Sequence, residues 1–326
     1  KVLKRFSPWN LVERETIVVR GRPQTYYSIF GISMLDYLDL YQKFIPTKQE
    51  SYKLDYIGKV ELGLQKDENP YDTFRDWYTK DFQSFIDYNI KDVEIVDGLE
   101  DKLKLIELIL TMAYEAKVNY NDVFSQVRMW DMLIYNFLRK ENIVIPPKED
   151  NVKEDKYDGA YVKDPLTGMH KWVVSFDINS LYPHLIMQYN ISPEKIIGVK
   201  SSGISVAKLL KQQTPLSHLK TEGACITPNG AMFKNDNPGF LPRLLEKMYN
   251  DRVKFKTLEF QSKQQYQKTK DKELTKKIAT YHNIQWAKKI SLNSAYGAIG
   301  NQYFRYYDVR QATAITTSGQ FVIRFI

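Results

Sequence analysis

The chain has 326 residues, of which 43% are hydrophobic, and a formal net charge of +8. It has no run of eighteen uncharged apolar residues, which argues against a membrane span, and its single cysteine, Cys225, excludes an internal disulfide and a cysteine-cluster metal site. The length predicts two or three compact units. Both ends are expected to lie inside a longer chain, because the start lacks an initiator Met and a signal-peptide pattern and the last residues lack a helix terminator.

In the first half of the chain, residues 28–40 begin with strand-like apolar residues and continue with helical spacing. Residues 82–117 carry apolar positions at helical spacing, which predicts two or three helices packed on a sheet. Another helix is expected over about 130–140, before the boundary at Pro146-Pro147. The charged stretch 148–156 is expected to be a linker.

In the second half, residues 160–162 and 172–176 are strand-like, and the turn residues 164–168 between them predict a hairpin. Asp177 lies at the end of the second predicted strand, and a helix is expected to begin near Ser180. Two long helices without interior breaks are predicted from Pro242 to about Phe260 and from Asp271 to about Ala298.

The positive charge is concentrated in these two long helices. Residues 241–290 contain 13 Lys and Arg against 5 Asp and Glu, a net of +8, so the remainder has 34 residues of each sign and is neutral. A basic helix pair on a neutral body suits a polyanion such as nucleic acid or a triphosphate. A solvated helical hairpin that binds neither explains the charge alone equally well.

The segment Ser175-Phe176-Asp177-Ile178-Asn179-Ser180-Leu181-Tyr182-Pro183 places a carboxylate between a predicted strand and a predicted helix. A carboxylate there can hold a divalent cation, and the free N–H groups of the helix start can receive phosphate. An Asp in this place is more often a helix cap or a turn former.

On the last long helix, Lys289, Asn293 and Tyr296 are spaced i, i+4 and i+7 and share one face. That face offers a cation for phosphate, an amide for hydrogen bonding and a ring for stacking, although an ordinary amphipathic helix has the same pattern. Arg252 and Lys256 are spaced i and i+4 on the other helix. If they face Lys289, the three cations form a clamp for a triphosphate.

These residues occur in an order that resembles the family B DNA polymerases. Asp177-x-x-Ser180-Leu181-Tyr182-Pro183 is similar to their motif A, and Lys289-x-x-x-Asn293-Ser294-x-Tyr296-Gly297 to their motif B. Tyr88-x-x-x-Asp92 resembles the third exonuclease motif, and Tyr157-Asp158-Gly159-Ala160 resembles the element between the exonuclease and polymerase domains. Residues 304–308 and 30–33 narrow the resemblance to the T-even bacteriophage type.

The resemblance implies a role for each matching residue. Asp177 and Lys289 would be catalytic, and Asp177, the Ile178 carbonyl and Asp92 would contact metal ions. The nucleotide would be bound by Ser180, Leu181, Tyr182, Arg252, Lys256 and Asn293, with Tyr182 excluding a ribose 2′-OH. Tyr296 and Gly297 would line the new base pair, Tyr157 and Gly159 would contact the template strand, and Tyr88 would orient the water in the exonuclease site.

The implied fold is mixed α/β and multidomain: the end of a ribonuclease-H-like exonuclease, a partial palm with an antiparallel sheet, and long antiparallel helical fingers. The expected segments are the exonuclease end, a returning part of the N-terminal domain, the first part of the palm, the fingers and the second part of the palm, over 1–104, 105–148, 149–238, 239–301 and 302–326. The family's motif C, Asp-Thr-Asp, is absent from this sequence, and the first two exonuclease motifs and the thumb are expected to lie outside it.

The implied activity is template-directed DNA synthesis from dNTPs with two Mg²⁺ ions, with a linked 3′→5′ exonuclease. Primer–template DNA, a sliding clamp and other replisome proteins would be the partners, and the cytoplasm of an infected bacterium the location. The isolated chain is expected to be inactive. Two alternatives are a non-catalytic module that binds nucleic acid or nucleotide and an RNA-synthesising enzyme, against which Tyr182 argues.

Overall fold

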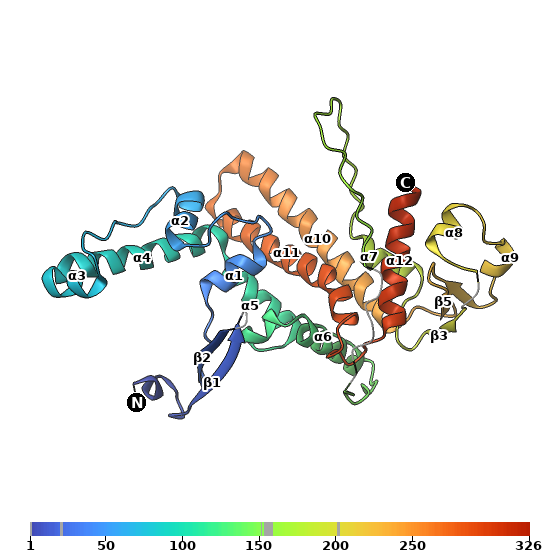
Figure 1. Cartoon of the computed structure of the whole chain (residues 1–326), viewed down its shortest axis with the longest axis horizontal. Coiled ribbons are helices and arrows are strands. Elements are labelled where there is room, and N and C mark those ends of the chain that lie inside the picture. The colour runs from blue at the N-terminus through green and yellow to red at the C-terminus, as the bar shows by residue number, and fades with distance from the viewer. Residues whose placement is uncertain (1, 20–21, 151, 153–158, 201–202) are drawn as a thin grey trace. The chain divides into compact units, whose positions relative to one another are not determined.

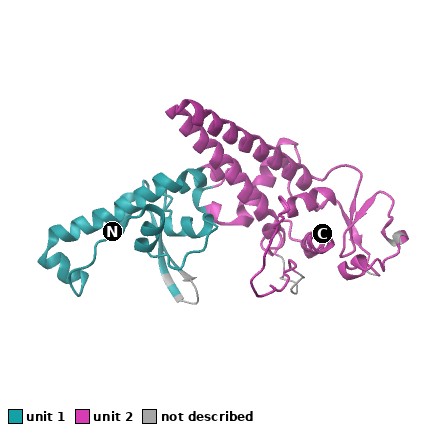
Figure 2. Cartoon of the chain, turned by 90° about the horizontal axis from the view of Figure 1, so that it is seen from above, with its two compact units in different colours: residues 1–110, 119–121 teal, residues 111–118, 122–326 magenta. Residues whose placement is uncertain are grey.

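The computed structural model describes residues 2–19, 22–150, 152, 159–200 and 203–326, and the chain divides into two compact units (Figures 1 and 2). Unit 1 contains residues 1–110 and 119–121, and unit 2 contains residues 111–118 and 122–326. The mixed helical architecture with small antiparallel sheets agrees with the predicted α/β class. The division into five segments stays a prediction.

Unit 1 combines a two-stranded hairpin with several helices. Strands β1 and β2 are antiparallel, with Val12 opposite Ile29 and Val19 opposite Arg22. The elements wholly in this unit are η1 (Leu3–Phe6), β1 (Val12–Val19), β2 (Arg22–Ile29), α1 (Tyr37–Phe44), α2 (Leu54–Leu62), α3 (Phe74–Lys80) and α4 (Phe82–Leu103).

The predicted helices over 82–117 are present as α4 and α5 (Leu105–Ala116), but the prediction that they pack on a sheet is wrong for α4. Helix α4 packs on α2 and α3, and its buried residues Ile95 and Leu99 lie in this helical core. Helical periodicity identifies a buried face without identifying the element that covers it.

Unit 2 is built around the long antiparallel helices α10 (Phe240–Thr269) and α11 (Lys272–Ile299), which lie side by side in Figure 1. Both were predicted, as were a helix before the double proline, α6 (Gln126–Lys140), and a helix after Ser180, α7 (Leu181–Gln188). The remaining elements are η2 (Tyr120–Phe124, shared with unit 1), β3 (Ile196–Val199), α8 (Val206–Leu210), α9 (Leu216–Leu219), β4 (Ala224–Ile226), β5 (Ala231–Lys234) and α12 (Val309–Phe325).

The start of α10 is held by side chains from the segment before β3. Asn190 Oδ1 accepts from the Gly239 N–H at 2.8 Å, and Glu194 Oε1 accepts from the Phe240 N–H at 2.7 Å. These residues satisfy N–H groups that have no partner inside the helix. The β3–β5–β4 sheet, antiparallel throughout, follows the same segment. The helix is therefore anchored at the end near this sheet.

The predicted hairpin over 160–176 is wrong as a pair of strands. Residues 159–178 contain no regular secondary structure, and the chain runs out and back as an extended loop (Figure 1). Trp172 is 98% exposed and Phe176 is 89% exposed. A two-stranded hairpin needs a packed face to be stable, and these apolar side chains have none among the described residues. Asp177 therefore follows an extended segment instead of a strand. Of the predicted linker over 148–156, residues 148–150 are irregular and residues 151 and 153–156 lie outside the described part.

Candidate active site

A cavity of about 670 Å³ in unit 2 brings together the residues predicted to bind a nucleotide. Its walls come from the loop before α7, the first turn of α7, the middle of α10 and the C-terminal half of α11. The lining residues are Asp177, Ile178, Asn179, Ser180, Leu181, Tyr182, Pro183, Arg252, Lys256, Lys289 and Asn293. Nine of them were predicted from the sequence as site residues, and the roles assigned to them stay predictions.

The antiparallel helix pair gives the cavity its charge. Arg252 and Lys256 are one turn apart on α10, and Lys289 and Asn293 are one turn apart on α11, so each pair presents one face of its helix. Asp177 is the one carboxylate among the described residues that line the cavity. Three cations and one carboxylate form a site that favours a multiply charged anion.

The loop that carries Asp177 is linked directly to α10. Arg252 Nη1 donates to Ser180 Oγ at 3.2 Å, and Asn179 Nδ2 donates to the Tyr249 hydroxyl at 3.3 Å. Ser180 is in the left-handed conformation, with φ 51° and ψ 47°, which costs a residue with a Cβ about 1–2 kcal/mol. Sequence reasoning missed Asn179 and Tyr249, because nothing in the local pattern shows that residues 70 positions apart meet.

Lys289 lies over an aromatic ring on its own helix. Its Nζ is 4.4 Å from the centre of the Trp286 ring, which is within the range of a cation–π interaction. The spacing i, i+3 permits such a contact on any helix, so Trp286 could have been found from the sequence.

The neighbouring Lys288 has a different environment. Its side chain is 7% exposed and forms ion pairs with Glu115 of α5 and, at 3.4 Å, with Asp251 of α10. The two adjacent lysines therefore have different roles. Lys288 joins residues of α5, α10 and α11, and Lys289 lines the cavity.

The residues predicted to contact DNA are placed in different ways. The Tyr296 ring lies 5.0 Å from the Tyr182 ring, measured between centroids. Gly297 faces Gln126, whose Oε1 would lie 2.7 Å from a Cβ at that position. The Gly159 carbonyl accepts from Gln320 Nε2 at 2.6 Å, outside the cavity. Tyr157 lies outside the described residues.

Asp92 and Tyr88, predicted for a second site, lie together on α4 in unit 1. Lys66 Nζ donates to Asp92 Oδ2 at 2.7 Å and to the Tyr88 hydroxyl at 3.5 Å. Although partial burial opposes it, hydrogen bonding to Asp92 raises the pKa of Lys66. The other oxygen of Asp92, Oδ1, is buried and has no hydrogen-bond partner among the described residues. Sequence reasoning missed Lys66, which carries no motif.

No group of three or more His, Cys, Asp or Glu side chains that could hold a metal lies within the described ranges. Asp177 and Ile178 both line the cavity, and a carboxylate and a backbone carbonyl are hard oxygen donors of the kind that Mg²⁺ accepts. Mg²⁺ commonly binds through one or two carboxylates together with water and substrate phosphates. The residues present therefore fit part of a magnesium site.

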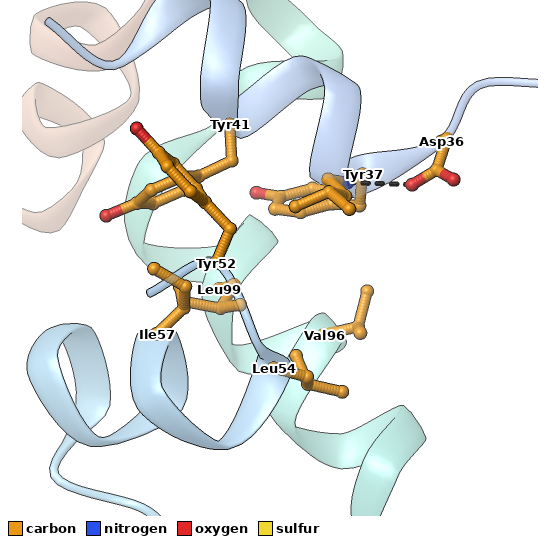
Figure 3. A pocket seen from close by; sticks show the side chains of 9 residues that line it. Asp36, Tyr37, Tyr41, Tyr52, Leu54, Ile57, Val96 and Leu99 are labelled. Carbon is orange, nitrogen blue, oxygen red and sulfur yellow. Dashed lines mark hydrogen bonds between the residues drawn. The ribbon is translucent and has the colours of Figure 1, made fainter. Parts of the chain in front are cut away.

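A second cavity, of about 230 Å³, lies in unit 1 between α1, α2 and α4 (Figure 3). Its walls are largely apolar, and the hydroxyl groups of Tyr37 and Tyr41 are bonded to Glu100 and Glu61. Burial raises the pKa of Tyr41 to about 12, with the hydrogen bond to Glu61 adding to the effect. Both hydroxyl groups are thus occupied in structural bonds, and the cavity lacks the convergent free polar groups of an active site.

Comparison with known proteins places this site in a family. The model of "DNA polymerase family B" matches residues 121–325, which include the whole lining of the larger cavity. The chain belongs to DNA polymerase family B. No helix in the described part of this polymerase-family chain has the length and hydropathy needed to cross a membrane.

The T-even phage type predicted from the motifs is confirmed by two relatives. The chain is 34% identical to the DNA-directed DNA polymerase of Escherichia phage RB69 and 33% identical to that of Enterobacteria phage T4. Each match covers 99% of this chain and 40% of the relative. The chain therefore spans less than half the length of these two proteins.

A solved structure has the same fold. The family B DNA polymerase from the hyperthermophilic archaeon Pyrobaculum calidifontis matches 98% of this chain and 38% of its own, with a TM-score of 0.69 and 19% identity. At this identity the likeness concerns the fold alone.

Proposed function

We propose that the chain is the nucleotide-binding part of a DNA-directed DNA polymerase that extends a primer 3′-OH with dNTPs. The observation that supports this most is the cavity in which Asp177 lies with Arg252, Lys256 and Lys289. Phosphoryl transfer depends on positioning and on neutralising charge more than on covalent chemistry. This set of side chains supplies both.

In this proposal the three cations hold the triphosphate and offset the charge that grows on the leaving pyrophosphate, with Asn293 assisting. The backbone N–H groups of Ser180 and Leu181, at the start of α7, bind phosphate oxygens. Tyr182 lies under the sugar and excludes a 2′-OH. Lys289 contacts the Trp286 ring and Arg252 donates to the Ser180 hydroxyl, and both side chains have further N–H donors for phosphate oxygens.

Asp177 and the Ile178 carbonyl would hold Mg²⁺ in this proposal. When bound, two such ions stabilise the attacking and the leaving oxygen of the transferred phosphoryl group. Asp177 is the one carboxylate among the described residues that line the cavity. We therefore propose that the 326-residue chain by itself binds nucleotide without turnover. Further carboxylates would come from the rest of the polymerase.

The proposal extends to the remaining predictions. Tyr296 and Gly297 line the new base pair, and Tyr157 and Gly159 contact the template strand of primer–template DNA. Asp92 and Tyr88 belong to a separate 3′→5′ exonuclease site that also uses Mg²⁺. The five predicted segments, with the fingers over 239–301, describe how these parts divide. Sliding-clamp and replisome contacts would lie in other regions, and the protein would act in the cytoplasm of an infected bacterium.

Triphosphate binding tests the proposal on the chain itself. The variant Arg252→Gln, Lys256→Gln, Lys289→Gln should weaken binding of dATP at least roughly tenfold and flatten its salt dependence, because fewer phosphate contacts remain. The matched control replaces Lys268, Lys272 and Lys276, which lie on the same two helices but not on the cavity wall. Equal weakening by both triple variants would show that general charge, and not this cavity, binds the nucleotide.

A further inference from the structure

The ring of Tyr182 lies directly against the backbone of α12. A Cβ built at Gly319 of that helix would lie 2.9 Å from Tyr182 Cε1 and 3.6 Å from Cδ1. The first distance is shorter than side-chain carbons normally approach, since carbon atoms in contact lie about 3.5–4.0 Å apart. The ring therefore occupies the space that any larger residue at position 319 would need.

Gly319 is unusual for its place in the fold. It is buried in the interior of α12, eleven residues after the N-cap Asp308. Glycine in a helix interior destabilises the helix relative to alanine, and the backbone here is helical, so no turn requires it. The close approach of the Tyr182 ring is the physical reason for glycine at this position.

The Tyr182 ring has a second aromatic neighbour. The Tyr296 ring of α11 lies 5.0 Å away, with an angle of 50° between the planes. Tyr182 also lines the cavity, together with Asp177 and Lys289. Contacts from two different helices therefore determine how far this ring extends into the space proposed for the sugar.

From this geometry we propose that Gly319 is a positioning residue for nucleotide selection. It sets the depth of the Tyr182 ring in the cavity, although it does not line the cavity itself. The inference rests on the proposed function, in which Tyr182 lies under the sugar of the incoming nucleotide.

The Gly319→Ala substitution should narrow the cavity at the position proposed for the sugar. The added methyl group pushes the ring away from α12, and because the ring lines the cavity, the space for the sugar becomes smaller. The KM for dNTP should rise at least roughly threefold, while kcat changes less, since the distortion acts on binding before chemistry. A ribonucleotide, which needs more space, should gain no advantage.

The test is a double-mutant cycle in the full-length polymerase that carries this chain, with wild type, Gly319→Ala, Tyr182→Ala and the double variant. We expect the KM effect of Gly319→Ala to fall below about 1.5-fold once the Tyr182 ring has been removed, because the methyl group then has space. The control is Gly98→Ala, a helix-interior glycine of unit 1 whose added Cβ would meet the side chain of Leu62. It should leave the KM for dNTP unchanged.

Two results would overturn the inference: an unchanged KM in Gly319→Ala, or the same rise with and without the Tyr182 ring. Both are distinct from failure of the proposed function, which would appear as unchanged ribonucleotide discrimination in Tyr182→Ala alone. If Gly319→Ala does not fold, folding of the double variant, followed by thermal unfolding, decides instead. A double variant that folds supports the contact, and a double variant that also fails to fold contradicts it.

Discussion

Arg252 on α10 donates a hydrogen bond from Nη1 to the hydroxyl of Ser180, at 3.2 Å, at the start of α7. Arg252, which we propose binds the triphosphate, is thus positioned by Ser180, whose backbone N–H we propose binds a phosphate oxygen. Arg252 Nε is buried and has no hydrogen-bond partner among the described residues. The remaining guanidinium N–H groups of Arg252, which lines the cavity, are the donors proposed for phosphate.

Ser180 is held in the left-handed region by the sharp entry into α7. The variants Ser180→Gly and Ser180→Ala both lose the hydroxyl, so they differ mainly in tolerance of positive φ. We expect Ser180→Gly to have the higher free energy of unfolding, by about 1 kcal/mol. At Ser262, within α10, the Ala variant should instead have the higher free energy of unfolding, because alanine is the better helix former. The same order at both positions in urea unfolding would contradict the conformational argument.

Lys288 and Lys289 provide a matched pair of substitutions. Lys288→Met leaves Glu115 and Asp251 without their buried cation, and we expect it to lower the free energy of unfolding by at least about 2 kcal/mol. The expected loss is smaller than for a fully buried pair because both carboxylates are partly exposed. Lys289→Met should cost less than about 1 kcal/mol, since it loses only a cation–π contact. Lys289→Met, in contrast, should weaken dATP binding more than Lys288→Met does. Equal losses of stability would show that the two lysines are equivalent.

Asp92→Ala in the full-length protein should remove 3′→5′ degradation of single-stranded DNA while primer extension continues. The reason is that Asp92 lies on α4 in unit 1, whereas the residues of the larger cavity lie in unit 2. Asp87→Ala, an exposed carboxylate on the same helix, is the control and should retain both activities. Loss of both activities in folded Asp92→Ala would refute two separate sites.

The ion pair of Lys195 with Asp236, 2.7 Å between Nζ and Oδ1, makes stability depend on pH. The hydrogen bond from Lys195, with that from the Asn237 N–H, lowers the pKa of Asp236 to about 2. A free Asp has a pKa of about 3.9, so the stabilisation is present above that pH and is lost as the pH falls through about 2. The thermal midpoint of Asp236→Asn should therefore lie further below wild type at pH 6 than at pH 3. An equal difference in thermal midpoint at the two pH values would contradict this. The control is Asp164→Asn, which replaces an exposed carboxylate.

The sequence predicted the long elements well, because their signals are local. Helices α10 and α11 show helical spacing without interior breaks, and the positions of Arg252, Lys256, Lys289 and Asn293 on their helices follow from a period of 3.6 residues. The helix start near Ser180 was also correct. Because the two helices are antiparallel neighbours, these side chains can face the same space, and the segment from Asp177 to Pro183 supplies the rest of the cavity wall.

The failures concern information that is not local. The residues before Asp177 have strand-like composition, but a strand forms only where another strand pairs with it. Lys288 and Lys289 are identical in type and adjacent, and only the positions of Glu115 and Asp251 separate the buried cation from the cavity residue. Lys66 and Gly319 belong to no motif, and their importance comes from a side chain far away in the sequence.

The central claim is that the cavity around Asp177 is where nucleotides are joined to a primer, and Asp177→Ala in the full-length polymerase tests it most directly. Primer extension should fall at least roughly a thousandfold, because a carboxylate that holds Mg²⁺ in phosphoryl transfer acts on the chemical step. Primer–template binding, measured on the same preparation, should stay within about threefold of wild type, since the variant removes a negative charge and no DNA contact. Extension that survives within about tenfold of wild type, with DNA binding intact, would show that the reaction takes place elsewhere.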